Sequence, residues 1–183
     1  MNEPSSASTP EPAATGPDLE RLVADVFRCA HGELLGTLYY LVGNLEDARD
    51  ALQEAFIKCW RNCDRAEVRD VKAWVFKIAL NTGRDMRRAA WSRRRQPLAE
   101  EAAAMLTSAT PSPDVALLQQ EQLELLRKAI LTLRPEEREV FLLRQNGALT
   151  YEQIAETTAA PLATVKSRMR SAVHKLHGAL AEG

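Results

Sequence analysis

The chain has 183 residues, of which 45% are hydrophobic and 27% are charged, and its formal net charge is −1. This size suits one or two small globular domains, and the absence of any apolar run near the roughly 18 residues that span a bilayer excludes a membrane-spanning segment. The near-zero charge conceals a local asymmetry, because cations cluster in two places while acidic residues occupy tails and connectors. Net charge alone is therefore a poor guide to partners.

Residues 1–18 are rich in Pro, Ser, Ala and acid, and they predict a disordered tail because such a segment buries too little apolar area to become ordered. They lack the basic start and apolar core of a secretion signal, so we expect a cytoplasmic protein. Cys29, Cys59 and Cys63 are interpreted as buried thiols in a reducing compartment. The alternative, a metal shared by Cys59 and Cys63, lacks further nearby ligands in the sequence.

From Leu19 onward the apolar residues recur at helical period. A first helical stretch ends at Gly43 and Asn44, and helices follow over 45–64 and 71–91. The residues expected to form the apolar faces of these three stretches are Leu22, Val26, Phe27, Leu34, Leu35, Leu38, Leu41 and Val42; Ala48, Leu52, Ala55, Phe56 and Cys59; and Val71, Val75, Ile78, Ala79 and Met86.

A strongly basic strip closes this half of the chain, with six arginines between positions 84 and 95 against the single acid Asp85. Such a strip attracts a phosphate backbone, although a solvated helix end with cations near its negative dipole has the same composition. Trp74, on the same helix, suits either a core position or a platform on which an unpaired base stacks.

Residues 96–114 contain three prolines and little amphipathic pattern, which indicates a linker. Helicity resumes near Val115. Pro135, followed by two acids, predicts the start of a further helix that ends at Asn146 and Gly147.

The last forty residues predict two short helices joined by a tight turn. Thr150 and Gln153 have the spacing of a capping box, and Pro161 with its two preceding alanines forms the connector. In the second helix, a buried stripe of Val165, Met169, Ala172 and Leu176 leaves the cations and hydroxyls facing outward. This is the layout of a DNA-binding helix-turn-helix.

No segment alternates at period two, so the fold class is all-α: two small helical bundles joined by a flexible linker, the C-terminal one with the helix-turn-helix. The expected divisions are a tail at 1–18, a first bundle at 19–95, a linker at 96–114 and a second bundle at 115–183. His31, His174 and His177 are scattered, and no Gly-rich phosphate loop occurs. We expect neither an enzyme nor a cofactor or metal.

Three segments carry a family resemblance: EDARDALQEAFIKCW, KAWVFKIALNTGRDMRR and LRPEEREVFLLRQNGALTYEQIAETTAAPLATVKSRMRSAVHKL. Their order and spacing resemble the extracytoplasmic-function sigma factors of bacterial RNA polymerase, over roughly Leu19 to Leu180. The resemblance makes 19–95 a region 2-like domain and 115–183 a region 4-like domain. It implies a transcription initiation factor that binds core RNA polymerase and promoter DNA, and that an anti-sigma factor controls.

The resemblance also implies roles for three sets of residues. Core polymerase binding falls on Asp50, Gln53 and Glu54, with Phe56 packed beneath them. Recognition and opening of the minus-ten element falls on Lys72, Lys77, Asn81, Arg84, Arg87 and Arg88. Reading of the minus-thirty-five element falls on Thr164, Lys166, Ser167, Arg168, Arg170 and Ser171.

Two other functions remain open from the residues alone. A dimeric helix-turn-helix regulator would bind a palindromic operator without polymerase. A helical protein-interaction adaptor would bind no DNA, and its binding would depend little on salt.

Overall fold

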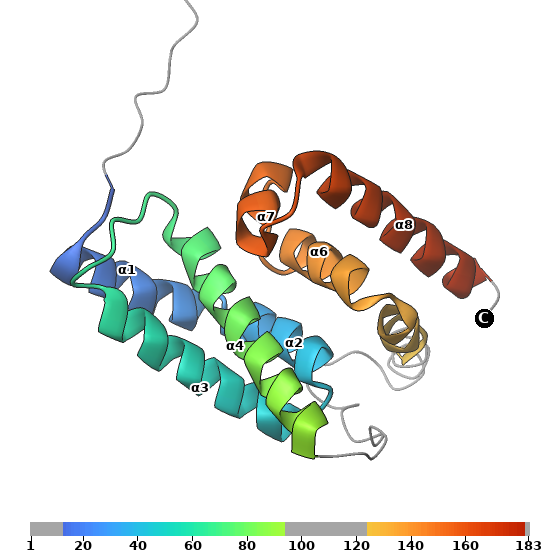
Figure 1. The fold of residues 1–183 in the computed structure, drawn as a ribbon, viewed down its shortest axis with the longest axis horizontal. Coiled ribbons are helices and arrows are strands. Elements are labelled where there is room, and N and C mark those ends of the chain that lie inside the picture. The colour runs from blue at the N-terminus through green and yellow to red at the C-terminus, as the bar shows by residue number, and fades with distance from the viewer. Residues whose placement is uncertain (1–12, 94–123, 182–183) are drawn as a thin grey trace, which may run out of the picture.

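The computed structural model describes residues 13–93 and 124–181, and all regular secondary structure in these two ranges is helical apart from one isolated bridge. The predicted linker 96–114 and most of the predicted tail lie outside the described residues. In Figure 1, α8 and α3 lie on opposite outer sides of the molecule, with α2, α4 and α6 between them. The all-helical prediction is confirmed for these ranges.

The first predicted helical stretch is two helices, α1 (Gly16–Cys29) and α2 (His31–Val42), separated at Ala30. The buried stripe of α1 is Leu19, Val23 and Phe27, whereas Leu22 is 36% exposed. The prediction that Leu22 faces inward was therefore wrong: spacing by four residues keeps a side chain on the buried face, and Leu22 lies off that row. The predicted end of α2 is confirmed, because Gly43 adopts the left-handed conformation with φ 95°.

The two longest helices of the N-terminal bundle pack against each other and against α2. Helix α3 (Leu45–Asn62) begins at Asn44, whose Oδ1 accepts a hydrogen bond from the backbone N–H of Asp47 at 2.8 Å. Helix α4 (Val71–Arg93) begins after Asp70, whose carboxylate accepts from the N–H of Ala73 at 2.8 Å. The buried residues of these two helices include Ala48, Ala51, Leu52, Ala55, Cys59, Val75, Phe76, Ala79 and Leu80.

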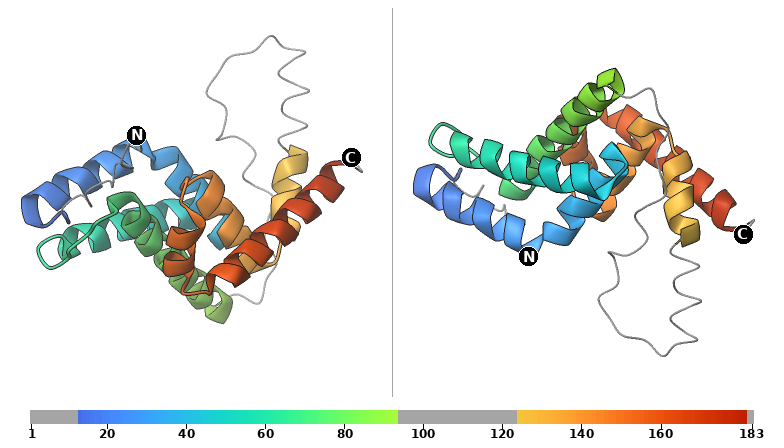
Figure 2. Two further views of the ribbon diagram at one scale, coloured as in Figure 1. Left: turned by 90° about the horizontal axis from the view of Figure 1, so that it is seen from above. Right: turned by 90° about the horizontal axis from the view of Figure 1, so that it is seen from below.

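The C-terminal bundle consists of a helix at residues 124–132, α6 (Pro135–Gln145), α7 (Tyr151–Thr158) and α8 (Leu162–Ala181). Pro135 starts α6, as predicted. Figure 2 shows the C-terminal end of α8 at the end of the molecule away from α1.

The two bundles share one hydrophobic core. Val140, Leu143, Leu149 and Ile154 of the C-terminal half belong to the same buried cluster as the core of α1 to α4. Gly147 lies at this junction: an added Cβ would lie 3.4 Å from Cδ1 of Phe76, 3.0 Å from Cγ of Leu149 and 2.6 Å from the carbonyl oxygen of Leu143. A side chain at this position would clash with the Leu143 carbonyl oxygen of the same bundle, whereas the Phe76 ring lies at ordinary van der Waals distance.

Candidate nucleic-acid interface

One face of α4 gathers most of the polar residues that the sequence assigns to DNA. Lys77, Asn81 and Arg88 are exposed and Arg84 is half-buried. Their spacing of four, three and four residues places them in one row along the helix. This row, Lys77 to Arg88, is called the α4 cationic face.

The other two predicted residues of α4 lie off this face. Lys72 is half-buried in the first turn, with its Nζ 6.0 Å from the centroid of the Phe76 ring. Arg87 is half-buried, and its charge acts on Arg138 of α6. Burial and, after it, the positive charge of Arg87 lower the pKa of Arg138 from its ordinary value. Arg87 therefore lies toward the C-terminal bundle.

Arg84 is engaged within the chain. Its Nε donates to Oε1 of Glu139 at 2.9 Å, and its Nη2 donates to Oε2 at 2.5 Å. The Glu139 side chain on α6 is only 4% exposed, and that of Arg84 is 27% exposed. The hydrogen bonds to Glu139 raise the pKa of Arg84 above its ordinary value. Two parallel bonds between a guanidinium and a carboxylate form a geometry that a phosphate group also satisfies.

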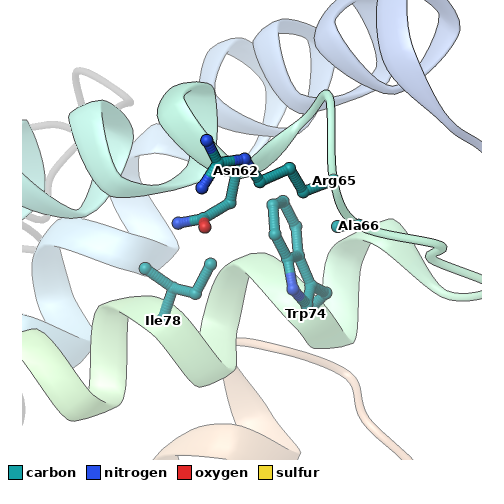
Figure 3. A pocket seen from close by; sticks show the side chains of 5 residues that line it. All are labelled: Asn62, Arg65, Ala66, Trp74 and Ile78. Atoms are coloured by element: carbon teal, nitrogen blue, oxygen red, sulfur yellow. The ribbon is translucent and has the colours of Figure 1, made fainter.

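A hollow of about 310 Å³ lies beside the start of α4, lined by Asn62, Arg65, Ala66, Trp74 and Ile78. Figure 3 shows the Trp74 ring between α4 and the loop that follows α3, with Asn62 and Arg65 across from it. Trp74 is half-buried and packs against the shared core. Part of the Trp74 ring therefore belongs to the core, and part lines an open hollow with polar groups at its rim. This position is compatible with both interpretations of Trp74, a core residue and a platform for an unpaired base.

The outer face of α3 has a different character. Asp50, Gln53 and Glu54 are all exposed, and a Glu54 carboxylate oxygen lies 3.6 Å from Nζ of Lys58. Phe56 packs edge-on against Phe27 with ring centroids 5.1 Å apart, as expected for a residue beneath the polar face. The three polar residues form the α3 acidic face.

Helices α7 and α8 form the predicted helix-turn-helix. The Thr150 hydroxyl accepts from the N–H of Gln153 at 3.2 Å, and the Gln153 side chain accepts from the N–H of Thr150 at 2.6 Å. The predicted capping box is confirmed. At the turn, Ala159 is left-handed, with φ 52°.

The buried stripe of α8 is the predicted one: Val165, Met169, Ala172 and Leu176. Lys166, Ser167 and Arg170 are exposed, and Thr164 and Arg168 are half-buried. Ser171 faces the bundle, because its Oγ donates to Oε1 of Glu137 at 2.8 Å. Helix α8 contains no acidic residue, so its exposed surface offers a phosphate backbone only attractive or neutral groups.

Two of the three cysteines lie in the core. Cys59 and Cys63 are fully buried, and the Cys63 thiol donates to the carbonyl oxygen of Cys59 at 3.3 Å. Burial, with a smaller contribution from Cys63, raises the pKa of Cys59 to about 12, so this thiol stays protonated. Cys29 is exposed, contrary to the expectation that all three are buried. Within the described ranges, no three His, Cys, Asp or Glu side chains gather as metal ligands.

The sequence did not indicate Glu137, Arg138 or Glu139 as members of this interface. All three take part in contacts between distant segments, and Arg138 donates to the carbonyl oxygen of Tyr40 at 3.0 Å. Asn62 and Arg65 were missed in the same way, because the hollow exists only once α3 and α4 pack. Among the helices of 13–93 and 124–181, none is long and apolar enough to cross a bilayer.

The geometry defines an all-helical class of protein with a helix-turn-helix and a second cation-bearing helix. Two family models match the amino-acid sequence: sigma-70 region 2 over residues 26–93 and sigma-70 region 4 over residues 123–176. The RNA polymerase sigma-H factor of Pseudomonas aeruginosa is 30% identical over 156 residues, covering 78% of this chain and 79% of that protein. The chain belongs to the extracytoplasmic-function sigma factors, a family of transcription initiation factors rather than enzymes.

Other relatives differ in length. The ferric citrate uptake sigma factor FecI of Escherichia coli is 31% identical over 144 residues, covering 78% of this chain and 82% of FecI. The ECF sigma factor SigE of Mycolicibacterium smegmatis is 30% identical over 144 residues, which are 79% of this chain but only 56% of SigE.

Solved structures share the fold. The sigma factor RpoE of Bartonella quintana, in complex with the anti-sigma factor NepR, matches with a TM-score of 0.69 and 23% identity over 91% of this chain and 98% of RpoE. CnrH, in complex with the cytosolic domain of CnrY, matches with a TM-score of 0.61 and 20% identity, covering 89% of this chain and 90% of CnrH.

Proposed function

We propose that this chain is a transcription initiation factor that binds core RNA polymerase, directs it to specific promoters and helps to open the DNA. The observation that carries the proposal is the separation of charge on one molecule. The α4 cationic face and the exposed cations of α8 lie on different helices, and the α3 acidic face lies on a third. Phosphate attracts the first two surfaces and repels the third.

Each surface has its own role in this proposal. The α3 acidic face binds polymerase through Asp50, Gln53 and Glu54. The α4 cationic face, with Lys72 and Arg87 beside it, binds the minus-ten element. The N-terminal half of α8 enters the major groove at the minus-thirty-five element, where Lys166, Ser167 and Arg170 are its exposed polar side chains, Thr164 and Arg168 flank them, and Ser171 supports the helix from below.

Opening of the DNA exposes unpaired bases, and the hollow beside Trp74 suits one of them. Its indole supplies a stacking surface, while Asn62 and Arg65 supply hydrogen-bonding groups at the rim. Stacking of a base on an aromatic ring contributes about 1 to 3 kcal/mol.

Control by an anti-sigma factor is part of the proposal, since the similar RpoE structure of Bartonella quintana is a complex with the anti-sigma factor NepR. We place the protein in the cytoplasm, where the polymerase acts, and assign it no catalytic activity of its own.

The decisive test is run-off transcription with purified core polymerase on a library of genomic fragments. We expect defined start sites only when both proteins are present. Gel shifts with and without core polymerase distinguish the alternative, because a dimeric regulator would bind a palindrome unaided. Binding that is insensitive to salt would favour the adaptor and contradict the proposal.

A further inference from the structure

Helix α6 carries two buried carboxylates that point to opposite sides. Glu137 and Glu139 are 6% and 3% exposed, and their separation by two residues turns their side chains about 200° apart. Glu139 reaches Arg84 of α4, while Glu137 reaches α8. In Figure 1, α6 accordingly lies between α8 and the N-terminal bundle.

Both oxygens of the Glu137 carboxylate accept hydrogen bonds. Lys175 Nζ donates to Oε1 at 2.9 Å and to Oε2 at 2.6 Å, and Ser171 Oγ donates to Oε1 at 2.8 Å. The backbone N–H of Arg134 donates to Oε2 at 3.1 Å. A buried carboxylate that lost these partners would be strongly destabilised, so the contacts hold α8 against rotation.

The apolar stripe of α8 does not fix that rotation by itself. Hydrophobic contact is non-directional. A helix with an apolar stripe can therefore rotate slightly about its own axis while most of the stripe stays buried. Ser171 and Lys175 are one turn apart on one flank of α8, and both bond to a single carboxylate. This arrangement selects one angle, because each hydrogen bond weakens steeply once its geometry is lost.

The angle matters for the exposed polar side chains of the same helix. Lys166, Ser167 and Arg170 are exposed in the half of α8 that precedes Lys175. Contacts with base edges need side chains placed within fractions of an ångström, whereas contacts with phosphate tolerate displacement of a flexible cation.

We propose that Glu137 is a positioning residue of the recognition helix: by holding Ser171 and Lys175, it sets the rotation of α8 and thereby which side chains read the upstream promoter element. The inference rests on the proposed function, because it assigns α8 to that element. Ser171, predicted as a reader of bases, acts here through Glu137 instead.

The test compares Glu137→Gln with Glu136→Gln, its exposed neighbour on the same turn of α6. The full chain with core polymerase is bound to promoters that carry each single substitution in the upstream element, after circular dichroism has shown every variant to be folded at the assay temperature. We expect Glu137→Gln to reduce discrimination between preferred and substituted elements about tenfold, the size of one lost base contact. Affinity for unrelated duplex should be kept or increased, because Lys175 is released. A merely destabilised fold would lower both affinities together.

A double-variant comparison and an NMR measurement provide two further tests. Lys175→Met should reproduce the loss, and the double variant with Glu137→Gln should lose no more than either single variant. Residual dipolar couplings of backbone amides in α8 relative to α6, measured on the free chain, should change in Glu137→Gln and not in Glu136→Gln.

Unchanged discrimination together with unchanged couplings in Glu137→Gln would overturn the inference. If the wild-type chain with polymerase shows no preference for any upstream element, the proposed function is wrong. The couplings would then still decide whether Glu137 sets the rotation of α8.

Discussion

Ala159 holds the turn between α7 and α8 in a left-handed conformation, with φ 52°. This conformation costs a residue with a Cβ about 1 kcal/mol relative to glycine. We therefore expect Ala159→Gly to raise the free energy of unfolding by about that amount, measured by urea denaturation. The matched control is Ala160→Gly, since Ala160 has no positive φ and packs against the core. Glycine at position 160 should lower the free energy of unfolding, because it relieves no left-handed strain and makes the unfolded chain more flexible. A gain at both positions would contradict the prediction.

Glu137 makes stability depend on pH. Burial raises its pKa, but hydrogen bonds from Lys175, Ser171 and the backbone of Arg134 outweigh burial, and the pKa is lowered from its ordinary value. A carboxylate with a lowered pKa stabilises the fold above its unfolded pKa of about 4.3, and this stabilisation is lost as pH falls through the lower folded value. The difference in unfolding free energy between the wild type and Glu137→Gln should therefore be largest above about pH 5 and shrink in more acidic buffer. A difference that stayed constant down to pH 2 would contradict this.

Sequence patterns predicted the residues whose roles are local. The capping box of Thr150 and Gln153 lies within one helical turn, and the exposure of Asp50, Gln53 and Glu54 follows from the period of α3. The partners of Ser171 and Arg84 lie 34 and 55 residues away, and no periodic signal marks them. For this reason Ser171 was expected to face outward, and Arg84 was expected to be free for DNA.

At the scale of elements, Gly83 allows α4 to lie close to α2. An added Cβ would lie 3.0 Å from Cδ2 of Leu38 and 3.3 Å from Cδ1 of Leu41, and both leucines are buried. Gly178, inside α8, has nothing within 4 Å. Gly178→Ala should stabilise the protein by about 0.5 kcal/mol through helix propensity. Gly83→Ala should be at least about 1 kcal/mol less favourable, because overpacking offsets that gain.

Thermal and urea unfolding of these two variants, side by side, measure the difference. Equal stabilisation by both substitutions would mean that Leu38 and Leu41 move aside freely, and that the tight packing of α4 on α2 does not constrain position 83.

The elements themselves were largely predictable, because apolar spacing and capping residues act within a few residues. The starts of α3, α4, α6 and α8 agree with the sequence pattern. The break at Ala30 was not foreseen, since α1 and α2 together have an almost continuous helical period and Ala30 is a good helix former. Tertiary packing, which buries Leu19, Val23 and Leu34, decides where the chain bends.

At the scale of the whole molecule, the ion pair between Arg84 and Glu139 ties α4 of one bundle to α6 of the other. We expect Glu139→Gln to increase the population in which the bundles separate, because the neutral amide holds the guanidinium less strongly. Spin labels at the exposed positions Arg61 and His177, in a chain whose exposed Cys29 has been replaced, report the distance distribution. The distribution should broaden toward longer distances in the variant.

Glu156→Gln, an exposed change on α7, serves as the control for this measurement. An identical distribution in Glu139→Gln and the wild type would mean that apolar packing alone closes the molecule. The closed arrangement could not be predicted from sequence, since it depends on the burial of Phe76 with Leu149 in one apolar cluster and on hydrogen bonds such as Asn146 to Thr37 across 109 residues.

The shared core has a consequence during synthesis. Phe76 emerges from the ribosome well before Leu149 and Ile154, which complete the same apolar cluster. At a translation rate of about 5 to 20 residues per second, several seconds pass in which the nascent N-terminal bundle has no cover on that side. The growing polypeptide therefore exposes this apolar surface to chaperones before its release from the ribosome. A transcript truncated after α4 should yield a product that aggregates.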